Sequence, residues 1–240
     1  MENLKGKKVV VLGGSVGIGF ATAKAAAEEG AEVIIVSSNP ERLNKALGQL
    51  PGNAQSFTAD LANEQQIAAL FKTIGHFDHL VFTAGEALHL GNVADTDFDA
   101  AKKLFNVRYW GAFSAVKYAS GNINVGGSIT LTGGSASKRP GAGWGLGASI
   151  CAAMEGFTRA MAVELAPIRV NIVVPGLVKT SLWANMTTED QDGMFNYFSE
   201  KLPVKYVAGP DDIALTYLYL MKQPYGTGQS VVVDGGYVLV

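Results

Sequence analysis

Short apolar runs alternate with helix-like segments along the whole chain, and this alternation limits the possible folds more than any other feature of the sequence. Most of the runs are continuous and β-branched, which is typical of parallel strands covered on both faces. The predicted strands are Lys8–Leu12, Glu32–Val36, Ala54–Thr58, His79–Phe82, Gly127–Leu131, Arg169–Val173 and Ser230–Val233. The predicted helices are Gly17–Glu29, Asn39–Gln49, Asn63–Thr73, Asp97–Ser120, Ser149–Leu165 and Pro210–Met221. This alternation predicts an α/β fold with a doubly wound parallel sheet and helices on both faces. No linker-like tract divides it, so residues 1–240 are expected to form a single domain.

The composition excludes several classes of protein. A single cysteine can form neither an internal disulfide nor a Cys₂ or Cys₄ zinc pattern, and no metal site is predicted. The chain has 19 basic and 21 acidic residues and no run of basic residues, so the sequence shows no basic patch that would bind a nucleic acid. No apolar run approaches the roughly 18 residues of a membrane span, and the first run is too short for a signal sequence. We therefore expect a soluble cytoplasmic protein that binds a small molecule and has neither a nucleic-acid nor a membrane partner.

A glycine-rich turn follows the first predicted strand. Glycine accounts for 29 of the 240 residues, well above the usual share of about 7%. Glycines between a strand and a helix allow a tight bend and a close approach to a diphosphate, while the helix N-terminus supplies N–H donors. The turn predicts a Rossmann-type dinucleotide site; the alternative is a tight turn that binds nothing. Its predicted cofactor contacts are Gly13, Ser15, Val16, Gly17, Ile18 and Gly19.

The end of the second predicted strand bears on the choice of cofactor. An NAD enzyme usually has a carboxylate here that binds the adenosine ribose hydroxyls, whereas this chain has Ser37. The small polar residues Ser37, Ser38 and Asn39, with Arg42 close behind, could accept a 2′-phosphate instead. We therefore predict NADP(H) in preference to NAD(H). Alternatively, Arg42 is an ordinary solvated helix residue.

Motifs spread over essentially the whole chain resemble those of the short-chain dehydrogenase/reductase family. The turn Gly13–Gly19 resembles the family's Thr-Gly-x-x-x-Gly-x-Gly motif, with Leu12 in place of the threonine. Thr83-Ala84-Gly85 resembles the Asn-Ala-Gly motif that supports the sheet, and Val232–Tyr237 resembles the family's C-terminal segment. The resemblance implies further contacts with the adenine and with the nicotinamide carboxamide. The cofactor residues that it adds are Asp60, Leu61, Ala84, Gly85, Thr132, Pro175, Gly176, Val178 and Thr180.

The catalytic residues of this family are missing from the positions where the resemblance places them. The tyrosine position falls on Gly147 and the lysine position on Cys151. The serine position falls next to Ser135, and the asparagine position falls on Arg108. No shift of the alignment restores the tyrosine, because residues 121–193 contain none. The chain therefore resembles an atypical member of the family that lacks the Tyr-x-x-x-Lys motif.

The missing tyrosine affects which reaction the site can support. A ketone that receives a hydride becomes an alkoxide and needs a proton or strong electrostatic stabilisation. An iminium ion that receives a hydride becomes a neutral amine and needs no proton in the transition state. The resemblance implies an NADP(H)-dependent oxidoreductase for a largely apolar C=O or C=N substrate, and the absent tyrosine favours C=N. The alternative is a catalytically weak or inactive NADP(H)-binding protein with a regulatory or structural role.

Arg108 and Ser135 are the candidate catalytic residues. A guanidinium is permanently charged and is a poor general acid, so Arg108 would act as an electrostatic stabiliser or a carboxylate anchor. Alternatively, it holds helix and loop structure, and Asn106 is a second candidate for the asparagine position. Ser135 would orient the substrate or cap a turn. Cys151 is interpreted as a small buried thiol and not as a nucleophile, because the three histidines of the chain lie in other segments.

Bulky residues mark the expected substrate side of the site. Trp144 would lie across an aromatic or flat apolar substrate, or only pack its loop, and Gly147 borders the same place. Residues 180–203 resemble the family's substrate lid, in which Trp183 and neighbouring aromatic side chains would roof an apolar pocket, pack together or form a subunit contact. The resemblance also implies a homodimer or homotetramer, assembled through the two long predicted helices and the last strand.

Overall fold

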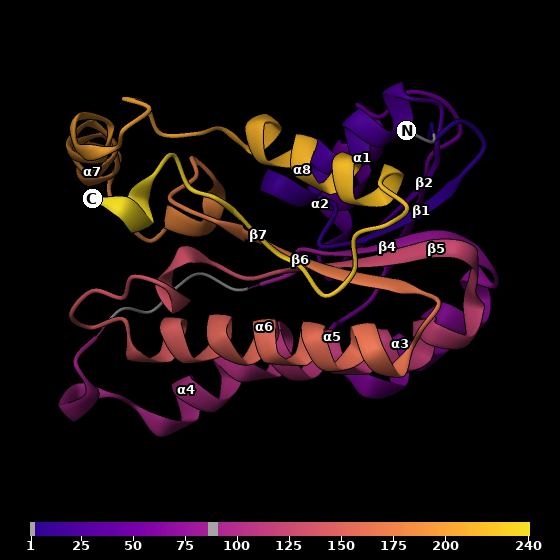
Figure 1. The fold of residues 1–240 in the computed structure, drawn as a ribbon, viewed down its shortest axis with the longest axis horizontal. Coiled ribbons are helices and arrows are strands. Elements are labelled where there is room, and N and C mark those ends of the chain that lie inside the picture. Colours follow the sequence, from indigo (N-terminus) through magenta and orange to yellow (C-terminus); the bar gives the residue numbers. More distant parts are fainter. Residues whose placement is uncertain (1–2, 86–90) are drawn as a thin grey trace.

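Seven parallel strands form one sheet in the part of the chain that the computed structural model describes, residues 3–85 and 91–240 (Figure 1). The strands are β1 Lys8–Leu12, β2 Glu32–Ser37, β3 Gln55–Thr58, β4 Phe77–Phe82, β5 Ile123–Thr132, β6 Arg169–Pro175 and β7 Ser230–Val233. Their order is β3-β2-β1-β4-β5-β6-β7, and each neighbouring pair is parallel. The chain therefore winds outward in both directions from β1 and β4, which confirms the predicted doubly wound sheet.

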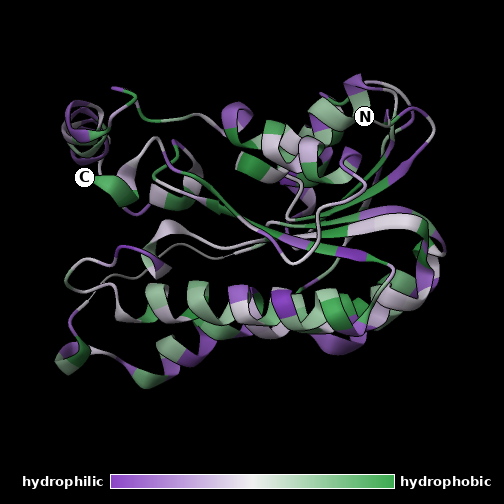
Figure 2. Ribbon diagram, in the orientation of Figure 1, coloured by the Kyte–Doolittle hydropathy of each residue, from purple (hydrophilic) through white to green (hydrophobic). Residues whose placement is uncertain are grey.

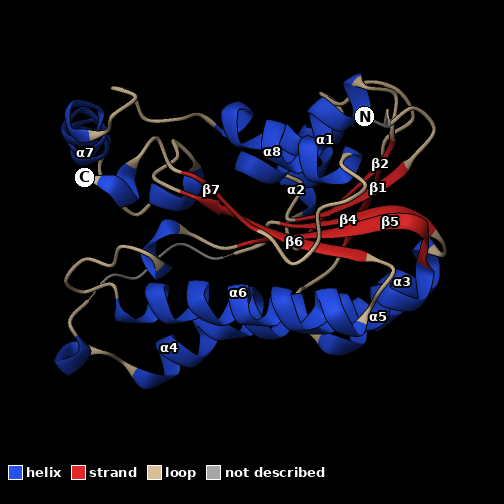
Figure 3. Ribbon diagram, in the orientation of Figure 1, coloured by secondary structure: helices blue, strands red, loops and turns tan. Residues whose placement is uncertain are grey.

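Helices cover both faces of this sheet, as predicted (Figure 3). One face carries α1 Gly17–Glu28, α2 Pro40–Leu47 and α8 Pro210–Lys222. The other face carries α3 Glu64–Ile74, α5 Ala112–Ala119 and α6 Gly145–Glu164. Two more helices, α4 Phe98–Phe105 and α7 Thr188–Lys201, lie toward the end of the molecule where the strands finish (Figure 1). None of the described helices is both long and apolar enough to cross a membrane.

The sheet is buried from both sides because its side chains alternate between two apolar layers. Val9 and Val11 pack with α1 and α8, whereas Val10 packs with α3, α5 and α6. In the sheet, Val10 lies between Ile34 of β2 and Leu80 of β4. Hydrophobic segments accordingly run through the middle of the sheet in Figure 2. This two-sided burial explains why the strand sequences are continuous apolar runs.

The prediction of one helix over Asp97–Ser120 is wrong in its middle part. A π-helical turn, Asn106–Gly111, separates α4 from α5. At this turn the backbone of Gly111 packs closely against Leu61, which is distant in the sequence. A Cβ on Gly111 would lie only 2.3 Å from the backbone oxygen of Leu61. π-Helical turns are frequent at functional sites, and Arg108 lies in the middle of this one.

The segment 180–203 has a small apolar cluster of its own. Buried Trp183 and Phe195 belong to this cluster, together with Leu202. The indole Nε1 of Trp183 donates a hydrogen bond to the backbone oxygen of Val178 at 3.0 Å. Helix α7 lies beyond the carboxyl ends of the strands (Figure 1). The segment therefore covers one side of the space at this end of the sheet.

Candidate functional site

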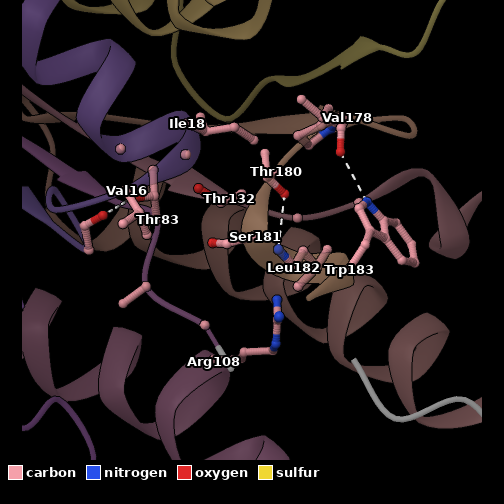
Figure 4. A pocket seen from close by; sticks show the side chains of 18 of the residues that line it. Val16, Ile18, Thr83, Arg108, Thr132, Val178, Thr180, Ser181, Leu182 and Trp183 are labelled. Atoms are coloured by element: carbon pink, nitrogen blue, oxygen red, sulfur yellow. Dashed lines mark hydrogen bonds between the residues drawn. The ribbon is translucent and has the colours of Figure 1, made fainter. Parts of the chain in front are cut away.

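A cavity of about 660 Å³ opens at the carboxyl ends of the central strands (Figure 4). It lies at the switch point between β1 and β4, which is where open α/β sheets bind their ligands. All but one of the residues predicted for the site line this cavity. They are Gly13, Ser15, Val16, Gly17, Ile18, Gly19, Ser37, Ser38, Arg42, Asp60, Leu61, Ala84, Gly85, Arg108, Thr132, Ser135, Trp144, Gly147, Pro175, Gly176, Val178, Thr180 and Trp183.

Close packing requires glycine in the turn between β1 and α1. A Cβ on Gly19 would lie 2.3 Å from the backbone oxygen of Gly13 and from Thr83 Oγ1. Gly13 has a φ of +87°, and a Cβ there would lie 2.6 Å from the backbone nitrogen of Ala84. No side chain caps α1 at its N-cap residue, Val16. The amides of the first helical turn are therefore left for an external acceptor, as an anionic ligand such as a diphosphate requires.

The end of β2 has a polar lining without a carboxylate. Ser37, Ser38 and Arg42 face the cavity, and the one carboxylate in the described lining, Asp60, follows β3 instead. Asn39 is the predicted residue that does not line the cavity. Its Oδ1 accepts a hydrogen bond from the backbone nitrogen of Arg42 at 2.8 Å and so caps α2. A side-chain amide at this position serves the helix start.

Arg108 extends from the π-helical turn into the cavity (Figure 4). Its guanidinium packs against Gly85, where a Cβ would lie 2.7 Å from Cζ and 2.8 Å from Nη1. A larger residue at position 85 would therefore displace the guanidinium. The described lining contains three charged side chains: Arg42, Asp60 and Arg108. Arg42 and Asp60 lie near the ends of β2 and β3, whereas Arg108 lies on the π-helical turn.

Gly147 and Cys151 line the cavity from the start of α6, which begins at Gly145, four residues before the predicted start. Burial raises the pKa of the Cys151 thiol to about 11, although nearby Arg108 opposes this rise. The thiol is protonated at neutral pH and is not an activated nucleophile. Among the lining residues that the structure describes there is no lysine, and Tyr237 is the single tyrosine.

The turn after β5 brings Ser135 to the cavity. The backbone oxygen of Ser135 accepts hydrogen bonds from the amides of Lys138 and Arg139, each at 2.9 Å, so its carbonyl holds this turn. The same turn is bonded to Glu155 of α6, which is 4% exposed and accepts hydrogen bonds from Lys138 Nζ and Ser137 Oγ. Burial would raise the pKa of Glu155, but these hydrogen bonds lower it below its ordinary value. Ionised Glu155 therefore anchors the loop that carries Ser135.

The cavity also contains residues that sequence reasoning did not assign to the site. Thr83 lines it, and the Thr83 hydroxyl donates to the backbone oxygen of Leu12 at 3.1 Å, which ties β4 to β1. Tyr237 lines it as well, and so does Phe198, one of the aromatic side chains of residues 180–203 that were expected to roof an apolar pocket. The signal for Thr83 was its place directly before Ala84. The signal for Tyr237 was the preceding pair of glycines, which have φ values of +65° and +89° and turn the chain back toward the site.

Comparisons with known proteins agree with this arrangement. A family model described as "Enoyl-(Acyl carrier protein) reductase" matches residues 13–238. Short-chain dehydrogenase/reductase malC of Malbranchea aurantiaca is 32% identical over 253 residues, covering 98% of this chain and 96% of that protein. The solved structure of the MalC reductase/Diels-Alderase from the same organism superposes with a TM-score of 0.92 and 32% identity, covering 99% and 98% of the two chains. A small-chain dehydrogenase solved in complex with NADPH is 36% identical, with a TM-score of 0.86 and coverage of 98% and 100%. With the doubly wound sheet and the glycine turn at its switch point, these matches over nearly the full length establish that the chain belongs to the short-chain dehydrogenase/reductase family of oxidoreductases.

Proposed function

We propose that this chain is an NADP(H)-dependent oxidoreductase that transfers a hydride to or from a largely apolar C=N or C=O substrate, and that C=N reduction suits its site best. One observation carries the proposal. The glycine turn, which fits a dinucleotide, and Arg108 line the same cavity. The described lining of this cavity contains no lysine. The NADPH complex of a relative that is 36% identical supports the choice of cofactor class.

The described residues of the cavity fit NADP(H). The amides at the start of α1 would bind the diphosphate, because no side chain caps this helix. Ser37, Ser38 and Arg42 would bind a 2′-phosphate, since no carboxylate stands beside them at the end of β2. Val178 and Thr180 would contact the carboxamide. When bound, the reduced nicotinamide supplies the hydride, and the residues of this chain bind and orient both reactants.

The choice between C=N and C=O follows from the proton donors in the cavity, since the one tyrosine of the described lining, Tyr237, has no lysine in that lining to activate it. An alkoxide that forms from a ketone would depend on hydrogen bonds from Arg108 and Ser135. Arg108 stabilises negative charge but does not release a proton, and the raised pKa of Cys151 leaves its thiol a weak acid. An amine that forms from an iminium ion needs neither donor at the moment of hydride transfer. The site therefore presents a smaller barrier to C=N reduction than to C=O reduction.

The segment 180–203 is proposed as the substrate lid. Thr180, Leu182 and Trp183 line the cavity, while Phe195 packs into the segment's own apolar cluster. Such a segment can move as a unit over a bound substrate. A homodimer or homotetramer is also proposed; it is supported by two neighbouring exposed aromatic side chains, Trp110 and Phe113, which are 56% and 40% exposed and whose ring centres are 6.1 Å apart.

A substrate panel tests the proposed function. After NADPH binding is confirmed by fluorescence titration, kcat/KM is measured for 1-pyrroline against cyclopentanone and for 3,4-dihydroisoquinoline against 1-tetralone. The proposal expects each imine to exceed its matched ketone, and the reverse order would refute the preference for C=N. The second candidate function, a cofactor-binding protein with little turnover, is favoured by the lack of lysine in the described lining. Tight NADPH binding with no turnover of any compound would support that candidate instead.

A further inference from the structure

The turn of residues 234–240 places Tyr237 at the cavity in a fixed backbone conformation. The carboxylate of Asp234 accepts hydrogen bonds from the amides of Gly236 and Val238, at 2.8 and 2.9 Å. Gly236 has a φ of +89°, and a Cβ there would lie 2.6 Å from Cγ of Pro203, which follows α7. The turn therefore packs closely against the segment that ends the lid, and Figure 1 shows it beside α7.

The side chains of Arg139 and Phe198 both contact Tyr237. Arg139 Nη1 donates to the backbone oxygen of Tyr237 at 2.6 Å, and its guanidinium carbon lies 4.8 Å from the centre of the tyrosine ring. Phe198 of α7 meets the same ring edge to face, with 5.9 Å between the centres. Phe198 lines the cavity, whereas Arg139 does not, so Arg139 acts on the site only through Tyr237 and through its own loop. Cation–π and edge-to-face contacts of this kind fix the orientation of a ring.

Arg139 also connects this ring to the loop that carries Ser135. Its amide donates to the backbone oxygen of Ser135 at 2.9 Å, while its side chain holds Tyr237, which is 98 residues further along the chain. The position of the Tyr237 ring is thereby set relative to Ser135. Trp144 and Trp183 line the same cavity from two other elements. The wall of the cavity therefore includes several aromatic side chains, one of which, Tyr237, is tied to the loop that carries Ser135.

We infer that Tyr237 is a specificity-determining residue that packs against a planar aromatic ring of the substrate, and that Arg139 is a positioning residue that holds Tyr237 in place. The inference rests on the proposed function, because it assigns the substrate class of the same cavity. An aromatic imine would place its ring against Tyr237 and its C=N bond toward Ser135 and Arg108. A small aliphatic imine has no aromatic ring to pack against Tyr237.

The test compares an aromatic with an aliphatic imine in matched variants. Tyr237→Leu is expected to lower kcat/KM for 3,4-dihydroisoquinoline about three- to tenfold, as the loss of one aromatic contact predicts. Its effect on 1-pyrroline should stay below about twofold, and Tyr237→Phe, which keeps the ring, should match the wild type. Arg139→Gln should mainly raise KM for the aromatic imine. The controls are Tyr225→Leu, since Tyr225 is 94% exposed, and Arg159→Gln on the exposed face of α6.

The double variant separates positioning from a general loss of structure. Because Arg139 acts through Tyr237, the combination of Tyr237→Leu with Arg139→Gln should be no worse than Tyr237→Leu alone. Additive losses would overturn the role of Arg139, and equal losses on both imines in Tyr237→Leu would overturn the role of Tyr237. Melting temperatures within a few degrees of the wild type establish that each variant is folded.

A binding measurement keeps this inference distinct from the proposed function. If the wild type reduces no compound of the panel, the proposed function fails, and calorimetric binding of naphthalene-2-carboxylate to the NADPH-saturated protein still tests the aromatic wall. Tyr237→Leu should weaken this binding about three- to tenfold, and Tyr225→Leu should not change it. An unchanged Kd in Tyr237→Leu, or no binding to the wild type, would overturn the inference.

Discussion

The first prediction is that acidification lowers the stability of the fold, because His79 of β4 is buried in the sheet as a neutral imidazole. The imidazole is 2% exposed, and its Nδ1 lies 2.9 Å from Ser128 Oγ on β5. Burial lowers the pKa of His79 from 6.5 to about 4; Asp78 opposes this shift, while Arg169 and Lys7 add to it. The folded chain therefore holds this histidine neutral over a pH range in which the unfolded chain protonates it.

The sign and size of the effect follow from this difference. The unfolded state binds the proton more tightly, so stability is full above the unfolded pKa of 6.5 and falls as the pH drops toward about 4. The complete loss corresponds to about 3 kcal/mol of unfolding free energy, of which about 2 kcal/mol falls between about pH 7 and pH 5. Glu64 and Glu155 have lowered pKa values, so their contributions are lost only below their ordinary value of 4.5. The range between pH 7 and pH 5 therefore reports mainly on His79.

Urea unfolding measures this loss directly. Midpoints and slopes are recorded at several pH values and one fixed protein concentration, for the wild type, for His79→Asn and for His76→Asn, which removes an exposed histidine. His79→Asn should be less stable than the wild type at pH 7 but should lose at least about 1.5 kcal/mol less on going to pH 5. His76→Asn should follow the wild type. If His79→Asn keeps the pH dependence of the wild type, the histidine is not buried as neutral imidazole and the reasoning fails.

Three substitutions test the cofactor and substrate parts of the cavity. Arg42→Ala should weaken NADPH binding about tenfold in a fluorescence titration and leave NADH binding unchanged; equal weakening would remove Arg42 from the choice of cofactor. Gly19→Ala should strongly weaken NADPH binding in the same assay, because its Cβ would lie 2.3 Å from the backbone oxygen of Gly13 and would displace the turn. Gly85→Ala should displace the Arg108 guanidinium and lower kcat/KM by about tenfold or more. The matched control is Gly121→Ala, whose Cβ meets open space, and a loss as large in the control would contradict the role of Gly85.

The strands and the glycine turn could be predicted from the sequence because each depends on neighbouring residues. A strand buried on both faces needs an unbroken apolar run, and the predicted bounds Lys8–Leu12 and Ser230–Val233 agree with the observed ones. The turn after β1 needs glycine wherever its own backbone doubles back, as at Gly19. Asn39 shows the limit of such reasoning, since a polar side chain at this point suits a ligand and a helix cap equally well.

The features that were not predictable depend on contacts between distant segments. The π-helical turn that carries Arg108 coincides with the approach of Gly111 to Leu61, 50 residues earlier in the chain. The place of Tyr237 depends on Arg139, and neither residue has a local pattern that reveals the other. Arg108 was a candidate from the sequence, but the π turn that carries it and the pairing of Arg139 with Tyr237 are identified only when the fold brings distant segments together.

The last prediction is that the rate of hydride transfer to a permanently charged iminium depends little on pH. The described lining contains no histidine and no lysine, and burial raises the pKa of Cys151 to about 11. Arg108 keeps its charge at every accessible pH. A permanently charged iminium such as N-methyl-3,4-dihydroisoquinolinium does not titrate either, so its single-turnover rate of NADPH oxidation should change less than about twofold between about pH 6.5 and pH 8.5. Stopped-flow fluorescence measures this rate. A step with an apparent pKa inside that range would reveal a titrating proton donor, and hydride transfer would then need the acid–base assistance that a C=O substrate requires.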